Sequence, residues 1–156
     1  MRLNTVPAAK SPVPAPDAAT LVATPVIRTG RTSATSWTLV LPITKPLSMN
    51  DRTHWRVRAD QVAVVRGAAF ILAKHAKVDK GCQRVRIVLH YRPIDRRRRD
   101  AINLAPTLKA CEDGLVDARV VPDDTPEFID PQMPVIEPWE AGQKRGLLWL
   151  EIERLL

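Results

Sequence analysis

The sequence predicts a single α/β domain of the α+β kind, in which a small mixed β-sheet of about four strands packs against two main helices. Some segments alternate apolar and polar residues, whereas others repeat apolar residues every three to four positions. The composition, 45% apolar and 26% charged, is typical of a globular protein. A chain of 156 residues suffices for one domain with a modest core. The predicted order is β-α-β-α-β-β.

Residues 1–34 are rich in Pro, Ala, Thr and Ser. We expect them to form a disordered tail, because they cannot bury enough surface to offset their ordering entropy. The folded domain is expected over residues 35–156. No apolar run approaches the roughly 18 residues of a membrane span, so no membrane partner is expected. Cys82 and Cys111 form no CxxC pair, which argues against zinc and favours reduced thiols in a cytoplasm.

The first half of the domain is predicted to hold one strand, one long helix and a second strand. The first strand begins near Ser36, because apolar and polar residues alternate from Trp37 to Leu41. A helix is expected over about 51–77, capped by Asn50 or Asp51. Its predicted buried stripe comprises Trp55, Ala59, Val62, Val65, Ala69, Leu72 and Ala76. The second strand is predicted over 84–91, with Val85, Ile87, Leu89 and Tyr91 on one face.

The second half is predicted to hold another helix and two strands. Asn103 can cap a helix that ends near Ala118, and Pro106 is tolerable in its first turn. The buried stripe of this helix is Leu104, Leu108, Cys111 and Leu115. An irregular strand is expected around 133–136, and a final strand over 146–154.

The charge of the chain favours an anionic partner. The formal net charge is +7, and four consecutive arginines, Arg96, Arg97, Arg98 and Arg99, end against Asp100. Four adjacent cations are costly unless an anion lies near, so we favour binding of phosphates over a merely solvated loop. From charge alone, nucleic acid ranks first and an anionic membrane surface second, and nucleic acid is the partner that we expect.

Three carboxylates are candidate metal ligands: Asp100, Asp123 and Asp124. Mg²⁺ prefers hard oxygen ligands and retains several waters, so one or two carboxylates can hold it. The alternative is that Asp100 caps a helix and Asp123-Asp124 belong to a turn. Lys109 can reach a phosphate or neutralise a leaving oxygen, or it can simply pair with Asp113, four residues on.

These motifs resemble the RusA-like Holliday junction resolvases, in an actinobacterial or phage-type variant. The resemblance covers roughly residues 37–153 and is most specific between Arg98 and Asp124. The matching positions are Pro42, Ser48, Asn50, Trp55-Arg56, Arg96 to Asp100, Asn103-Leu104, Lys109, Asp113-Gly114-Leu115, Val121 and Asp123-Asp124. The segment Ala105-Pro106-Thr107 matches an insertion of the longer variant.

The resemblance implies a homodimeric endonuclease that depends on Mg²⁺, which Mn²⁺ can replace, and that cuts four-way DNA junctions in recombination and repair. It assigns Asp100 and Asp124 to the metal, with Asp123 as a further candidate ligand, and Lys109 to cleavage. Arg56, Lys109 and the four arginines are the expected DNA contacts. Branched DNA is the expected partner, and the cytoplasm of a bacterium or of a phage-infected host is the expected location.

One position departs from the family pattern. The family's Asp-x-Asp-Asn segment requires an acid at position 102, where this chain has Ile102. If the segment is extended, positions 100 and 102 point the same way, and the isoleucine removes a metal ligand. A protein that binds junctions but cuts poorly or not at all is therefore the alternative function. A basic domain that binds structured RNA is a third.

Overall fold

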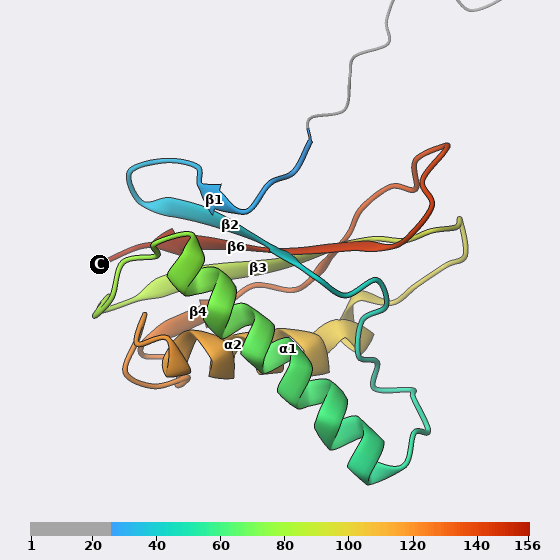
Figure 1. Ribbon diagram of the computed structural model, residues 1–156, viewed down its shortest axis with the longest axis horizontal. Coiled ribbons are helices and arrows are strands. Elements are labelled where there is room, and N and C mark those ends of the chain that lie inside the picture. Colours follow the sequence, from blue (N-terminus) through green and yellow to red (C-terminus); the bar gives the residue numbers. More distant parts are fainter. Residues whose placement is uncertain (1–25) are drawn as a thin grey trace, which may run out of the picture.

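The computed structural model describes residues 26–156, which fold as a mixed α+β domain (Figure 1). Two α-helices and one short 3₁₀ helix accompany six strands in this part of the chain. In chain order the elements are β1 (Gly30–Arg31), β2 (Ser36–Leu41), α1 (Trp55–His75), β3 (Val85–Arg92), η1 (Ala101–Leu104), α2 (Ala105–Asp117), β4 (Ile129–Pro131), β5 (Val135–Ile136) and β6 (Leu147–Arg154).

The sheet has the strand order β1-β2-β6-β3-β4, and β5 also pairs with β3. β6 lies antiparallel between β2 and β3, whereas β4 and β5 run parallel to β3. The register places Leu150 beside Leu39 on one side and Leu89 on the other, and all three are fully buried. These three long strands form the rigid centre of the fold.

Both α-helices lie on the same face of the sheet, and the core lies between the two layers (Figure 1). Val65, Ala69 and Ala73 are the buried side chains of α1. α2 approaches α1 closely at Gly114, where an added Cβ would lie 2.5 Å from the Arg66 carbonyl oxygen. Small residues on both helices therefore permit the close contact that closes the core.

The first two predicted strands are confirmed as β2 and β3, and β3 shows the predicted alternation. In β2 the alternation is incomplete, because Thr38 is buried between Trp37 and Leu39. The predicted tail is described only from residue 26 onward, and the expectation for residues 1–25 lies outside the described part. Within residues 26–34 the chain forms β1, which pairs with β2 at Gly30 and Arg31. The sheet thus begins before residue 35.

The beginning of α1 differs from the prediction. The cap is His54, whose Nδ1 accepts a hydrogen bond from the Arg56 amide, and not Asn50 or Asp51. Asp51 instead accepts a hydrogen bond from the Ser48 amide and so shapes the loop before the helix. Trp55 and Ala59 are exposed, against the prediction that both belong to the buried stripe. The physical reason is visible in Figure 1, where the first turns of α1 run past the edge of the sheet.

The segment before α2 also differs. Asp100 caps η1 by accepting a hydrogen bond from the Ile102 amide at 3.2 Å, whereas Asn103 lies inside η1. The segment is a 3₁₀ turn and not extended, so strand alternation does not set the direction of the Ile102 side chain, which is 46% exposed. The predicted stripe of α2 is confirmed: Leu104, Leu108, Cys111 and Leu115 are buried.

The region after α2 holds one strand more than expected. β4 is a three-residue strand ending in Pro131, and it shows no alternation from which to predict it. β5 falls within the predicted irregular strand, and β6 confirms the predicted final strand. Among the described residues, neither helix is long and apolar enough to cross a membrane. Cys82 and Cys111 are buried free thiols.

Candidate functional site

An open cleft of about 1180 Å³ lies at one end of the domain. Its walls come from three loops, which precede α1, follow β3 and precede β6, and Tyr91 at the end of β3 also lines it. Its charged lining consists of five cations and two carboxylates: Lys45, Arg98, Arg99, Lys144, Arg145, Asp51 and Asp100. The excess of cations makes the cleft a site for an anion.

Most of the cleft's cations lack a carboxylate partner. Among residues 26–156, no ion pair involves Arg98, Lys144 or Arg145. Lys45 is 80% exposed and lies 3.8 Å from Asp51, which is a weak contact. Their charge therefore remains available to a ligand.

Arg99 has a different environment from its neighbours. Its Nη1 lies 2.8 Å from Asp95 Oδ1 and donates to two backbone carbonyls, and its guanidinium lies 5.8 Å from the centre of the Tyr91 ring. The hydrogen bond from Arg99 holds the pKa of Asp95 below its ordinary value. Arg99 therefore shapes the loop, whereas Arg96, Arg97 and Arg98 are exposed.

Trp139 joins two of the loops. Its indole Nε1 donates to the Ile94 carbonyl at 2.7 Å, and the Arg96 guanidinium lies 4.5 Å from its ring centre. The third wall is fixed to α2 by Thr107, whose buried hydroxyl accepts from the Leu47 amide and donates to the Leu47 carbonyl. All three walls of the cleft are thus held by specific contacts.

Asp100 lines this cleft, but Asp124 and Lys109 do not. Lys109 lies on α2, where its Nζ forms ion pairs with Asp124 and with Asp113, the latter at 2.9 Å. Glu112 is a third carboxylate near the same ammonium, at 3.9 Å, and burial raises its pKa. The expected partner Asp113 is thus found, together with Asp124. No hydrogen bond or ion pair joins Asp100 to this group within the described residues.

Asp123 has a local role. Its side chain accepts a hydrogen bond from the amide of Asp124 at 2.8 Å. The hydrogen-bonded turn follows the pair, with the Phe128 amide donating to the Thr125 carbonyl. The cap formed by Asp100 matches the structural alternative for that residue.

The three candidate ligands do not form a ready metal site. Among residues 26–156, no group of three or more His, Cys, Asp or Glu side chains is arranged to hold a metal ion. Asp124 is already neutralised by Lys109. Asp100, which is exposed in the cleft, fits a metal held by one carboxylate together with waters and phosphate oxygens, which is a common arrangement for Mg²⁺.

Arg56 lies outside the cleft, near the beginning of α1, with its guanidinium 5.1 Å from the centre of the Trp55 ring. Three cleft cations were not among the predicted site residues: Lys45, Lys144 and Arg145. The adjacent pair Lys144-Arg145 after Gly142 was the available signal, since a basic pair beyond a glycine turn is exposed. Nothing in the sequence shows that these residues face Arg98.

Neither a scan of protein-family models nor a search of curated proteins found a match to this chain.

Proposed function

We propose that the chain binds branched DNA in its basic cleft and acts as a RusA-like, Mg²⁺-dependent endonuclease on four-way junctions. The observation that carries the proposal is the cleft itself, in which cations from three loops surround the exposed carboxylate of Asp100. Phosphates bind such a surface without readout of the bases, so the shape of the DNA selects the ligand.

The cleft residues have separate tasks in this proposal. Arg98, Lys144 and Arg145 bind backbone phosphates, since their charges are not neutralised within the described part. Arg99 and Trp139 hold the arginine loop in place through hydrogen bonds to backbone carbonyls. Lys109 supplies positive charge at a phosphate that approaches α2, provided that it leaves Asp124 or Asp113.

Asp100 would hold Mg²⁺ with waters and a substrate phosphate, and Asp124 would join it only after separating from Lys109. When bound, the metal polarises a phosphoryl oxygen and activates water for hydrolysis. A four-way junction contains paired strands, so the proposal includes a two-fold homodimer. Two exposed apolar residues farther along α1, Val64 and Ile71, offer a surface for it. The activity would place the protein in the cytoplasm of a bacterium or of a phage-infected host.

A second candidate is a junction-binding protein without nuclease activity. Two observations favour it: Ile102 stands where the family pattern has an acid, and Lys109 occupies the carboxylate of Asp124. Neither of these two features changes the charge of the cleft, so the protein can bind DNA without cutting it.

The decisive experiment incubates the full chain with a synthetic four-way junction and Mg²⁺, and measures binding and nicking separately. We expect nicking that Asp100→Asn and Asp124→Asn abolish, while binding persists. Asn caps η1 as well as Asp does, so Asp100→Asn retains the fold.

Binding without nicking, even with Mn²⁺, would establish the second candidate. Stronger competition by structured RNA than by the junction would contradict both. Ile102→Asp should increase nicking if position 102 faces the metal, and an unchanged rate would mean that it does not.

A further inference from the structure

Trp55 is the largest side chain that the fold leaves in solvent. It is the first residue of α1 and is 67% exposed, whereas Trp37 and Trp149 are 1% and 5% exposed. Its ring neighbours are the guanidinium of Arg56, at 5.1 Å, and the imidazole of His54, at 5.8 Å. A free indole of this kind exposes apolar area that proteins usually bury in a core or against a partner.

The charge around Trp55 indicates what kind of partner covers it. Residues 52–58 contain Arg52, Arg56 and Arg58 and no acid. A second copy of this segment would bring like charges together, and a neutral apolar partner would leave the arginines without counter-charge. A nucleic acid satisfies both features, because its phosphates neutralise arginines while its bases stack on aromatic rings.

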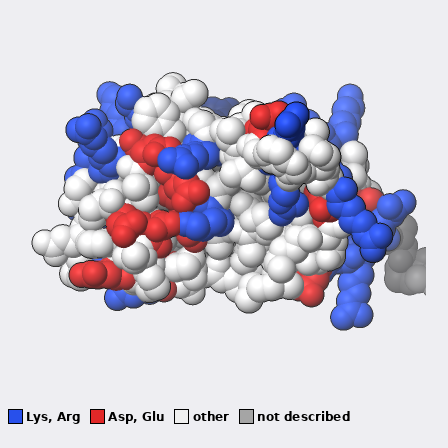
Figure 2. Space-filling model, turned by 90° about the horizontal axis from the view of Figure 1, so that it is seen from below, with Lys and Arg blue, Asp and Glu red and all other residues white. Residues whose placement is uncertain are grey.

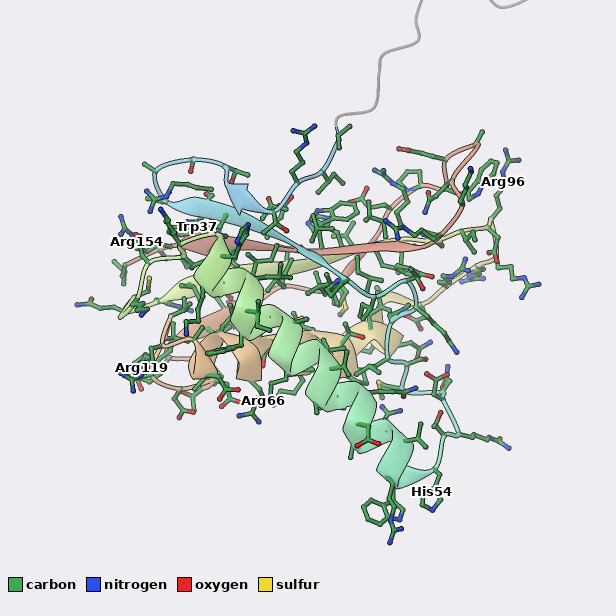
Figure 3. The ribbon with its side chains drawn as sticks, in the orientation of Figure 1. Trp37, His54, Arg66, Arg96, Arg119 and Arg154 are labelled. Atoms are coloured by element: carbon green, nitrogen blue, oxygen red, sulfur yellow. The ribbon has the colours of Figure 1, made fainter. Side chains whose placement is uncertain are left out.

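The Trp55 end of α1 lies next to the cleft. Arg58 Nη1 donates to the Ser48 carbonyl at 3.0 Å, and Ser48 lines the cleft. In Figure 3, His54 lies at the lower tip of the molecule, at the beginning of α1, and Arg96 lies at the upper right. A strand that leaves the cleft past Ser48 and Arg58 therefore runs toward the indole.

We propose that Trp55 stacks on a base with a free face, on a strand whose phosphates are held in the cleft. The inference rests on the proposed function and names a feature of its substrate, a base face left free where stacking is interrupted at a branch point or in a single strand. A fully paired duplex offers phosphates to the arginines but no free base face to the indole.

The test uses the full chain and compares Trp55→Ala and Trp55→Phe with Met133→Ala. Met133 is also strongly exposed, at 60%, but lies between β4 and β5 in the chain and does not line the cleft. The probes are oligothymidine, a four-way junction, a paired duplex of equal length, and phosphatidylserine vesicles. Affinity is measured by anisotropy, stacking by quenching of tryptophan emission, and oligomeric state by light scattering.

We expect Trp55→Ala to weaken oligothymidine and junction binding about tenfold or more, as loss of one base–aromatic stack does. Affinity for the duplex should stay unchanged, quenching should disappear, and Trp55→Phe should fall between. Met133→Ala should match the wild type. Thermal unfolding checks that the variants fold, which we expect because the side chain is exposed.

Equal losses on all three DNAs, or no loss on any, would overturn the inference. So would a loss confined to vesicle binding, or a change in oligomeric state. Quenching that persists in Asp100→Asn, which no longer cuts, separates stacking from catalysis. If the wild type binds no nucleic acid, the proposed function fails together with the inference. If it cuts junctions while Trp55→Ala binds and cuts equally well, only the stacking role fails.

Discussion

Two cations of the helix layer, Arg66 and Lys109, and three cations of the cleft have opposite surroundings. In the helix layer, Arg66 donates to both oxygens of Asp117, and Lys109 contacts three carboxylates. In the cleft, Arg98, Lys144 and Arg145 have no ion-pair partner within residues 26–156. Figure 2 shows acidic side chains gathered among basic ones in its left half, whereas Lys and Arg predominate at its right-hand end.

In this chain of net charge +7, unpaired cations therefore gather at the cleft. A cation that is paired within the fold mainly holds elements together, and an unpaired one raises the potential of the surface it occupies. Substitutions of Gly114 and Arg66 should therefore change stability and not binding, whereas substitutions of the unpaired cleft cations should change binding and not stability.

The largest effect is expected from the triple variant Arg98→Gln, Lys144→Gln and Arg145→Gln. Each lost phosphate contact makes the negative slope of log K against log salt less steep by about 0.9, so three losses weaken DNA binding roughly five hundredfold at about 0.1 M salt. Arg86→Gln is the control, because Arg86 is paired with Asp130 and Glu153. A salt titration followed by anisotropy measures the slope for both variants. Equal slopes for the triple variant and the wild type would show that these three cations do not contact DNA phosphates.

A stability effect without a binding effect is expected from Gly114→Ala. The new methyl would lie 2.7 Å from the Ala69 Cβ and 2.5 Å from the Arg66 carbonyl oxygen, so we expect a loss of about 1–3 kcal/mol in urea unfolding. Gly67→Ala, where nothing lies within 4 Å of the added Cβ, should instead gain up to about 1 kcal/mol. Stabilisation by both alanines would show that the helices are not in close contact at Gly114.

The smallest effect is expected from Arg66→Met. Both side chains of its pair with Asp117 are more than a third exposed, so solvent screens the pair and the loss at neutral pH should be smaller than that of Gly114→Ala. Hydrogen bonds from Arg66 lower the pKa of Asp117, so this stabilisation is present above the ordinary pKa and is lost as the pH falls through the lowered one. Urea unfolding from about pH 7 to about pH 2 should show the variant and the wild type converging. A constant difference would assign the effect to lost packing.

The sequence predicted those elements whose own residues carry the signal. Alternation located β2, β3 and β6, and the apolar stripe located α2. β1 and β4 are two and three residues long and exist through pairing with distant strands, which no local pattern shows. Helical periodicity predicts which face of α1 is buried, but it does not show where the sheet beneath the helix ends. The prediction that Trp55 is buried is therefore wrong.

The candidate site was predictable only in part for a related reason. Arg96 to Arg99 and Asp100 are adjacent in sequence, and the cleft contains the last two arginines and the aspartate. Lys45, Lys144 and Arg145 reach the cleft through loop contacts made by Thr107 and Trp139, which the sequence does not reveal. The pairing of Lys109 with Asp124 also depends on where the chain turns after α2.

The indole of Trp139 couples two otherwise independent segments, because it is bonded to Ile94 and carries Arg96 on its ring. Neither segment can rearrange without the other, so much of their conformational freedom is lost during folding. Less conformational entropy is then lost when a ligand binds. This pre-organisation should therefore strengthen binding and slow dissociation. A single tryptophan outside the cleft lining thus limits how far the arginine loop can move.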